Sequence, residues 1–509
     1  MNKFTVKSGA GFAVKPRFPQ LLAVSAAALL AGCSMIPKYE RPAAPIADQW
    51  PATSGFTTAS AQAQPAGANA PAVAAADIEW QAFFSDPKLR QLIEAALRNN
   101  RDLRIAVLNI EQARAQYGIR RADQFPTINA GITGSRQPNP NGNGSITSTY
   151  TAGLLMPSYE LDFFGRVASL KEAALAQYLA TEEGRKTAQI SLIASVANTY
   201  LSLLADEELL TITQQTLATR EESFKLSKLR FDNGVASELD FRQAESLTEA
   251  ARASLAQLVR QRALDQNALT LLIGQPLTGD LAVALPVGKG LSDAPLMVDV
   301  PAGLPSDLLT RRPDIRQAEQ QLLAANADIG AARAAFFPRI SLTASAGSAS
   351  SHLSGLFKSG SYGWTLAPQL ILPLFDAGRN RASLDSANAG RDIAIAQYEK
   401  SIQTAFREVA DALAGRDTLG EQLRAQQAQA NAEATRFKLA DLRYQNGVAS
   451  YLDQLDAQRS LFAARQAVVQ TRLAQLQSQV TLYKTLGGGW KEAPPEEALS
   501  LKASRQLSR

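Results

Sequence analysis

Helical and extended patterns of apolar residues alternate along the chain. From Arg166 to Asp232 no proline interrupts the sequence, and apolar residues step by three and four positions as in a coiled-coil heptad, at Ile190, Ile193, Ala197, Tyr200 and Leu204. The Asn233-Gly234 turn then breaks the pattern, and a return stretch reaches Ile273. The pattern predicts a helix of about 67 residues, about 100 Å long, followed by a return helix of about 35 residues.

Two regions show the alternation of apolar and small polar residues that is typical of strands. In region 127–158, Ile128, Ala130 and Ile132 alternate with polar or small residues, and the segment from Tyr150 to Met156 repeats the pattern. Region 339–373 does the same. The chain thus offers two strand hairpins, with four strands of about ten residues, the length that a tilted strand needs to cross a bilayer. The alternation suits a sheet with lipid on one face and water on the other.

The chain uses one plan twice. Residues 224–240 read FKLSKLRFDNGVASELD, and residues 437–453 read FKLADLRYQNGVASYLD, so the offset from 224 to 437 is 213 positions. At the same offset, Gly165-Arg166 corresponds to Gly378-Arg379. Similarity at a fixed offset indicates one supersecondary unit used twice in tandem. A second helical hairpin is therefore predicted over 379–486, with its turn at Asn446-Gly447.

Shorter helices are expected at the start of each copy. Asp86-Pro87 supply an N-cap and a proline at the first helical position, which predicts a helix to about Asn99. A longer helix is expected from Asp102 to about Gln124. In the second copy, Ser306 is expected to cap a short helix and Pro313-Asp314 to begin the long one.

The composition agrees with long helices in close contact, because aromatic residues make up only 7% of the chain. The formal net charge is +5, but four basic residues and no acidic ones lie in the first 32 residues, which leaves +1 for the remainder. Nucleic acid is therefore not an implied partner.

The N-terminus has the pattern of a secretory leader. A basic region precedes a short apolar run from Leu21 to Ala31, which is too short to span a bilayer, and Cys33 follows as the only cysteine. The segment Leu30 to Cys33 resembles a bacterial lipobox, which implies that Cys33 becomes the first residue of the mature protein and carries N-acyl and diacylglycerol chains. Ser34 after the cysteine implies sorting to the outer membrane. The alternative is that Cys33 is an ordinary buried thiol.

The predicted organisation has six parts, and the fold class is an α+β membrane protein. The parts are a signal peptide (1–32), a lipidated extended arm (33–79), a first repeat (80–275, with helical hairpin 166–273), a linker (276–305), a second repeat (306–487) and a C-terminal tail (488–509). Four strands cannot close a membrane barrel, so strands must come from several chains, and three copies give twelve. After Cys33 no run of 18 apolar residues occurs, which argues against a helical membrane protein.

These features together resemble the TolC-like outer-membrane efflux channels, and among them the lipid-anchored NodT-like or OprM-like branch. The resemblance covers Trp80 to Leu486 and is carried by the lipobox, Tyr159 to Arg166, Arg311 to Ile315, Phe336 to Pro338 and the duplicated Asn-Gly-Val-Ala-Ser turn. It implies a homotrimer with a twelve-stranded β-barrel in the outer membrane, a long α-helical barrel in the periplasm and a mixed equatorial domain.

The turns of the helical hairpins are the first candidate site. A glycine permits the positive φ that a tight reversal needs and lets another backbone approach closely. The resemblance implies that these turns dock a periplasmic adaptor protein through Gly234, Val235, Gly447 and Val448. The alternative is a simple turn requirement.

The second candidate site is a periplasmic gate. The spacing of Asp453 and Asp456 puts both carboxylates on one helix face. Threefold symmetry would place six of them near one axis, where like charges would raise each other's pKa, and the resemblance implies an acidic constriction there. A solvated helix face is the alternative. The resemblance further implies that Tyr444 and Asp240 join neighbouring helix pairs. The first copy differs, because Phe231 replaces the tyrosine and Gln243 the second acid, and Ala449 stands where the family has a basic partner.

The resulting interpretation is a passive exit duct of a tripartite efflux pump, energised by an inner-membrane RND-type transporter through the adaptor. Its substrates would be drugs or other small molecules, and its location the outer membrane of a Gram-negative bacterium. The only histidine, His352, lies in a predicted loop, so no catalytic site, cofactor or metal site is expected. A structural coiled-coil envelope lipoprotein and a periplasmic adaptor are the alternatives, with an enzyme as a third.

Overall fold

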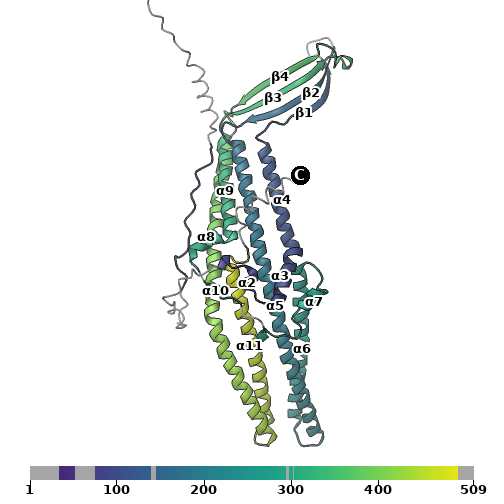
Figure 1. Ribbon diagram of the computed structural model, residues 1–509, viewed down its shortest axis with the longest axis vertical. Coiled ribbons are helices and arrows are strands. Elements are labelled where there is room, and N and C mark those ends of the chain that lie inside the picture. The colour runs from purple at the N-terminus through teal and green to yellow at the C-terminus, as the bar shows by residue number, and fades with distance from the viewer. Residues whose placement is uncertain (1–33, 52–74, 139–144, 294–296, 302, 491–509) are drawn as a thin grey trace, which may run out of the picture. The chain divides into compact units, whose positions relative to one another are not determined.

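The computed structural model describes residues 34–51, 75–138, 145–293, 297–301 and 303–490 (Figure 1). The predicted signal peptide and the lipidation residue Cys33 lie outside these described residues, as does most of the predicted tail. The described chain divides into two compact units, which are treated separately below. Of the described residues, those in 34–41, 113–178 and 321–394 belong to unit 1, and those in 42–112, 179–320 and 395–490 belong to unit 2. Both units therefore contain residues from the two halves of the sequence.

Unit 1 contains a four-stranded antiparallel sheet in the order β1-β2-β3-β4. The strands are β1 (Asn129–Pro138), β2 (Ile146–Leu161), β3 (Arg339–Ser350) and β4 (Tyr362–Ile371). These bounds confirm the two predicted strand hairpins. β2 is longer than predicted and pairs with both β1 and β3, with a shift of register between Met156 and Tyr159. Among the described strands, β1 and β4 each have one edge without a strand partner.

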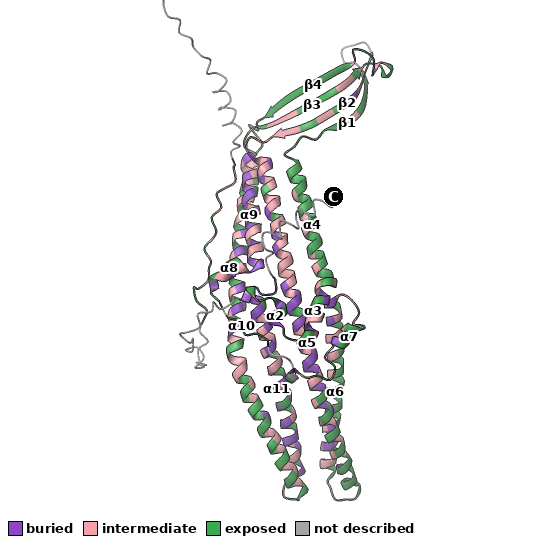
Figure 2. Cartoon of the chain, in the orientation of Figure 1, coloured by how far each residue is buried: buried purple, intermediate pink, exposed green. Residues whose placement is uncertain are grey.

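One face of the sheet gathers the apolar side chains. Between β1 and β2, Ile132 lies opposite Ala152. Between β3 and β4, Ala344 lies opposite Leu366 and Ala346 lies opposite Trp364. Trp364 is 70% exposed, and Figure 2 shows β4 as exposed along its length. The opposite face carries polar residues such as Thr133 and Thr151, whose hydroxyl groups are 2.6 Å apart. The alternation predicted from the sequence is therefore present in the sheet.

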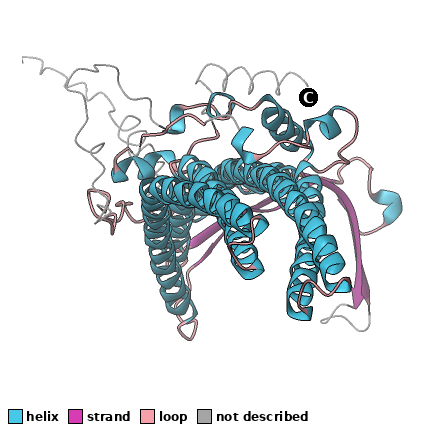
Figure 3. Ribbon diagram, turned by 90° about the horizontal axis from the view of Figure 1, so that it is seen from below, coloured by secondary structure: helices cyan, strands magenta, loops and turns pink. Residues whose placement is uncertain are grey.

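Unit 2 contains most of two helical hairpins. Hairpin one consists of α5 (Arg166–Asp232) and α6 (Glu238–Ile273), and hairpin two of α10 (Arg379–Gln445) and α11 (Tyr451–Thr485). In Figure 3, seen from below, the turns that close the two hairpins face the viewer. α5 and α10 each have 67 residues, as predicted, and both pairs of helices begin 213 positions apart. An equivalent position below means a residue of hairpin two that lies 213 positions after its counterpart in hairpin one.

The short helices that precede the hairpins confirm one predicted cap and correct another. α3 (Pro87–Asn99) begins after Asp86, whose carboxylate accepts a hydrogen bond from the Lys88 backbone N–H at 2.8 Å. The prediction that Ser306 caps a helix is wrong. Residues 305–307 form a 3₁₀ turn that begins with a proline, and the carboxylate of Asp307 accepts from the Leu304 N–H at 3.2 Å. α8 (Leu308–Arg311) follows that turn.

The remaining helices connect these elements. They are α2 (Trp80–Phe83), α4 (Arg101–Ala122), α7 (Asp280–Ala284) and α9 (Pro313–Ala334). α9 starts at Pro313, as predicted. α2 anchors the end of α11, because Phe83 stacks on Tyr483 with ring centroids 4.0 Å apart and Phe84 meets the same ring edge-on. This aromatic cluster is part of the buried core of unit 2.

One helix of the described chain is long and apolar enough to cross a membrane by length and composition. An 18-residue window of α5 has a mean hydropathy of 1.3, although the chain has no uninterrupted apolar run of that length. The residues of that window are 61% buried against the rest of the chain. Buried core helices pass the same test, so this window is explained by packing within the chain.

Candidate functional site

The turns of the two hairpins have the same backbone geometry. Gly234 and Gly447 have φ angles of 73° and 71°, in the left-handed region that glycine favours. Apart from the glycine itself and its two neighbours, no heavy atom of the described residues lies within 4 Å of the position that a Cβ would take at either glycine. The turn conformation, and not crowding inside the chain, therefore explains both glycines.

Backbone and side-chain hydrogen bonds close each turn in the same way. The N–H of Val235 donates to the Arg230 carbonyl at 2.8 Å, and the equivalent N–H of Val448 donates to the Arg443 carbonyl at 2.9 Å. Both valine side chains are directed to solvent, with 76% and 68% of their surface exposed. Each turn thus presents one apolar side chain at its end.

Asp240 and Asp453 have a local role that sequence analysis missed. Each is the third residue of its helix and forms a capping box with the serine at the N-cap, Ser237 or Ser450. The Asp453 carboxylate accepts hydrogen bonds from the Ser450 hydroxyl at 2.9 Å and from its N–H at 3.2 Å, and Asp240 does the same with Ser237. The Ser-x-x-Asp spacing in both copies was the signal that could have revealed these caps.

Asp456 belongs to a network of charges in hairpin two. Its carboxylate lies 2.5 Å from Nη2 of Arg436 on α10 and 3.4 Å from Nη2 of Arg459 on its own helix. The hydrogen bond from Arg436, together with the charge of both guanidinium groups, holds the pKa of Asp456 below its ordinary value. Within one chain the pKa of Asp456 is thus lowered, whereas the rise expected for a ring of six carboxylates in a trimer stays a prediction. Asp453 does not share the network, because its carboxylate binds Ser450.

Tyr444 joins the two hairpins through a residue that sequence analysis did not select. Nη1 of Arg230, at the end of α5, donates to the Tyr444 hydroxyl, and the guanidinium carbon lies 5.3 Å from the centroid of the same ring. Tyr444 also packs on Tyr451, with ring centroids 5.3 Å apart. At the position equivalent to Tyr444, Phe231 instead stacks on Phe241 of its own hairpin.

A small apolar cluster lies beneath this contact. Its buried members come from both hairpins: Ala244, Tyr451 and Leu455, with Phe224, Leu247 and Tyr444 packed against them. A cleft of about 290 Å³ adjoins the cluster between α6 and α11, with Gln243, Leu452 and Arg459 among its lining residues. The two hairpins therefore meet near their turns through a polar contact, an apolar cluster and an open cleft.

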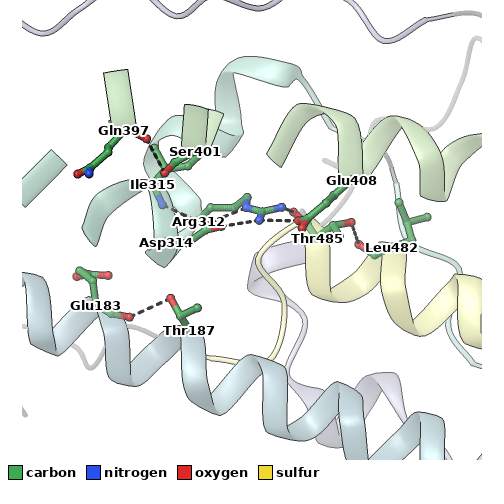
Figure 4. A network of polar contacts seen from close by, with 10 residues as sticks. All are labelled: Glu183, Thr187, Arg312, Asp314, Ile315, Gln397, Ser401, Glu408, Leu482 and Thr485. Carbon is green, nitrogen blue, oxygen red and sulfur yellow. Dashed lines mark hydrogen bonds and ion pairs between the residues drawn. The ribbon is translucent and has the colours of Figure 1, made fainter. Parts of the chain in front are cut away.

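The base of hairpin two has a buried charged joint (Figure 4). Arg312, only 7% exposed, donates to the carbonyl of Thr485 at 2.9 Å and forms ion pairs with Asp314 and Glu408 at 2.6 and 2.8 Å. Two carboxylates and a carbonyl compensate the buried guanidinium. The joint connects the start of α9 with α10 and the end of α11.

The base of hairpin one makes the same connection without charge. Asn100, which lies 212 positions before Arg312, donates from its side chain to the carbonyl of Leu272 at 2.8 Å and caps α4 by accepting from the Leu103 N–H at 2.8 Å. Leu272 is the equivalent of Thr485. The same contact is thus made by an amide in one copy and by an ion-paired arginine in the other.

Among the described residues, the histidine of the second strand hairpin hydrogen-bonds its sequence neighbours. Nδ1 of His352 lies 3.0 Å from the Ser351 hydroxyl in an exposed segment between β3 and β4. Within the described ranges, no three His, Cys, Asp or Glu residues are placed to hold a metal ion.

A sheet with one apolar face and two helical hairpins that meet near their turns define the class of an outer-membrane channel subunit. Comparison with known proteins agrees. The profile of the outer membrane efflux protein family matches residues 92–275 and 304–488. The chain therefore belongs to the outer membrane efflux protein family. It is a protein of the outer membrane of a Gram-negative bacterium and is not an enzyme.

Curated relatives have high identity over most of the chain. The probable efflux pump outer membrane protein TtgC of Pseudomonas putida is 50% identical over 470 residues, which cover 91% of this chain and 94% of the relative. The outer membrane protein OprJ of Pseudomonas aeruginosa is 48% identical over 94% of this chain and 97% of its own.

Solved structures have the same fold. A membrane protein from Pseudomonas aeruginosa matches with a TM-score of 0.80 and 47% identity, covering 89% of this chain and all of that one. The open state of the MtrE outer membrane channel of Neisseria gonorrhoeae matches with a TM-score of 0.79 and 42% identity, over 90% of this chain and 99% of that one. The resemblance to TolC-like channels is thereby confirmed, and the adaptor and envelope-spacer alternatives are set aside.

Proposed function

We propose that this chain is the outer-membrane exit duct of a tripartite efflux pump, which passively conducts small molecules from the periplasm to the exterior. The contact of Arg230 with Tyr444 carries the proposal of a gate, because it ties the end of hairpin one to the end of hairpin two. The relatives that are named as efflux pump outer membrane proteins support a partnership with a periplasmic adaptor and an inner-membrane RND-type transporter.

The conducting form would be a homotrimer built from tandem repeats. The sheet has four strands and free edges at β1 and β4, and an open edge cannot face lipid because its backbone groups would lack partners. The smallest membrane barrels have about eight strands, so one copy is too few. Three copies supply twelve strands and six helical hairpins, with the apolar face of each sheet toward lipid.

A lipid on Cys33 would anchor each subunit in the same membrane. Two residues soon after it support a fixed position for the mature N-terminus. The Pro37 carbonyl accepts from the Asn326 side chain of α9 at 2.8 Å, and a Cβ at Gly330 would lie 2.7 Å from the Ile36 side chain. The described start of the arm is therefore packed against α9 within unit 1.

The gate would close where the hairpins meet. Arg230 and Tyr444 hold the two hairpins together, and Asp456 contributes a negative charge that Arg436 and Arg459 partly compensate. Asp240 and Asp453 support the gate by capping the helices that carry it. Opening would require the hairpins to separate, which breaks the Arg230 contact and exposes the apolar cluster beneath it. The energy for this step would come from the pump partners.

The turns would dock the adaptor. Val235 and Val448 are exposed apolar side chains next to Gly234 and Gly447, which present open backbone. A partner hairpin that packs on them would bury apolar surface, which stabilises a complex by about 25 cal/mol per Å².

Recording from the purified chain in a planar bilayer tests the conduction itself. A duct gives unitary conductance steps, whereas a protein that only spaces the envelope gives none.

A strain that lacks the gene should become sensitive to some members of a drug panel and regain resistance when the chain is supplied. Supplying a variant with Val235→Asp and Val448→Asp should leave the conductance intact but not restore resistance, if the turns dock the adaptor.

A further inference from the structure

A buried and a half-buried acidic residue lie together midway along hairpin one. Asp206 on α5 is only 5% exposed and hydrogen-bonds the carboxyl group of Asp265 on α6. The second oxygen of Asp206, Oδ2, has no hydrogen-bond partner. A hydrogen bond between two carboxyl groups requires a proton on one of them, because both ionised groups would repel each other and neither could donate.

The charged groups around the pair are limited. Glu207 on α5 and Arg262 on α6 pair with each other next to it, and the side chain of Gln261 donates to Oδ1 of Asp265 at 3.3 Å. Burial, followed by the charge and hydrogen bond of Asp265, raises the pKa of Asp206 to about 7, while Arg262 acts in the opposite direction. Asp206 therefore gains and loses its proton near neutral pH.

The pair also lies where the linker attaches to hairpin one. Oε2 of Glu207 accepts from the Gly288 N–H at 3.3 Å, and Oε2 of Glu208 accepts from the Ser292 N–H at 3.3 Å. Three consecutive acidic residues of α5 thus contact α6 and the linker at one height. A change in the spacing of α5 and α6 at this height would therefore alter the contacts of α5 with α6 and with the linker.

Hairpin two has no such pair. The positions equivalent to Asp206 and Asp265 are Leu419 and Ser478, and the Ser478 hydroxyl faces the Ala412 carbonyl at 3.4 Å. The equivalents of Glu207 and Arg262 are Gly420 and Gln475, which are uncharged. Two hairpins with the same backbone plan therefore differ at this height by four ionisable groups.

We propose that Asp206 and Asp265 form a proton-dependent clasp, which holds α6 against α5 while one proton is shared and releases α6 when that proton is lost. Loss of the proton leaves the buried carboxylate of Asp206 ionised beside the carboxylate of Asp265, and α6 moves away from α5 because the two charges repel each other and Asp206 gains hydration. The proton goes to water, and no other reactant is needed.

The position of the clasp gives it influence over the turn. Asp232 ends α5 26 residues beyond Asp206, which is about 39 Å along a helix. If α6 stays straight, its displacement from α5 midway along the hairpin also displaces its end at the turn. Because the turn joins α6 to the end of α5, Arg230 would shift relative to Tyr444. Only this last consequence rests on the proposed gate, whereas the clasp itself does not.

Two measurements on the purified full-length chain test the clasp. Infrared difference spectra between about pH 6 and about pH 8 should contain the carbonyl band of a protonated carboxyl group that disappears at the higher pH. Asp206→Asn and Asp265→Asn should each remove this band. Asp411→Asn, which removes an exposed carboxylate of α10, should retain it. If the band persisted in both Asn variants, the proposal would be overturned.

Hydrogen exchange then tests the release. After correction for intrinsic rates, the amides of α6 near Asp265 should exchange about tenfold faster at the higher pH in the unsubstituted chain, and show no such pH dependence in Asp206→Asn. Amides of α11 near Ser478 serve as the internal control and should not change. Equal pH dependence in both hairpins would overturn the clasp. A pH-dependent α6 with unchanged bilayer conductance would confirm the clasp and refute only its connection to the gate.

Discussion

Hairpin one and hairpin two have the same backbone plan but differ in which equivalent positions carry paired acidic or basic groups. Both have a 67-residue first helix, a glycine turn and a Ser-x-x-Asp capping box. Hairpin two has its ion pair of Arg436 with Asp456 near the turn, where hairpin one has the uncharged Ser223 and Gln243. Hairpin one has its carboxyl pair midway, where the equivalent positions of hairpin two are the uncharged Leu419 and Ser478.

The difference shows that the residues that determine the helix ends are not the residues that determine the charges between the helices. Helix ends depend on caps and glycines, which are the same in both copies because both need the same turn. Buried and half-buried polar groups determine how firmly each helix pair is held and at which pH. The joints at the base follow the same rule, because Asn100 and Arg312 donate to equivalent carbonyls with different charge.

The largest predicted effect is at the charged joint. Arg312→Ala would leave Asp314 and Glu408 without their shared cation and the Thr485 carbonyl without its donor, so we expect a loss of about 3–5 kcal/mol in the free energy of unfolding. Asn100→Ala, the matched change in the other half, should cost about 1–3 kcal/mol because it leaves a neutral carbonyl unpaired. Denaturant unfolding measures both. Equal losses would contradict the comparison of the joints.

The next effect is the pH dependence of stability in hairpin one. The pKa of Asp206 rises from 3.8 to about 7 on folding, so the folded chain binds more protons than the unfolded chain between these values. The contribution of this group is therefore most stabilising at low pH, is lost as the pH rises from about 4 to about 7, and is constant above that. Unfolding midpoints measured across this range should lose this slope in Asp206→Asn and keep it in Asp411→Asn. A slope unchanged by Asp206→Asn would be evidence against the raised pKa.

A smaller effect should be equal in the two hairpins. Asp240→Ala and Asp453→Ala each remove half of a capping box, and we expect each to cost about 1 kcal/mol. Amide exchange in the first turns of α6 and α11 should increase in the respective variant. If Asp453→Ala had a much larger effect on conductance than Asp240→Ala, Asp453 would act in the gate beyond its cap.

The smallest effect on stability is expected at Asp456. Its carboxylate is exposed and ion-paired, so Asp456→Asn should leave the unfolding midpoint unchanged. It should reduce the preference of the channel for cations, because Arg436 and Arg459 then lose their counter-charge. Reversal potentials under a salt gradient measure this preference, with Glu421→Gln as a control at an exposed acid farther along α10. An identical preference in Asp456→Asn would place the acidic constriction elsewhere.

Much of the fold could be predicted because strong local signals mark its boundaries. The Asn-Gly turns, the long runs without proline and the alternation around Ile132 and Ile340 gave the helices and strands closely. The error at Ser306 has a local cause, since Pro305 begins a 3₁₀ turn and Asp307 contacts the Leu304 N–H.

The side-chain partners could be predicted only in part. Arg436 and Asp456 lie ten residues to either side of Asn446, so the register of an antiparallel hairpin could have paired them. The same register places Asp206 opposite Arg260, five positions from Asp265, and nothing in the sequence says that Asp206 is buried. The contact of Arg230 with Tyr444 joins two hairpins whose approach no local pattern specifies. Such contacts depend on tertiary packing.

Channel recordings on a double-mutant cycle test the central claim that Arg230 and Tyr444 hold the hairpins closed. Arg230→Ala and Tyr444→Phe should each raise the open probability several-fold, and the double variant should be no more open than either single variant, because both changes remove one shared contact. Arg443→Ala, at the position equivalent to Arg230, should leave it unchanged. Independent, multiplying effects of the two changes, or an equal effect of Arg443→Ala, would contradict the account.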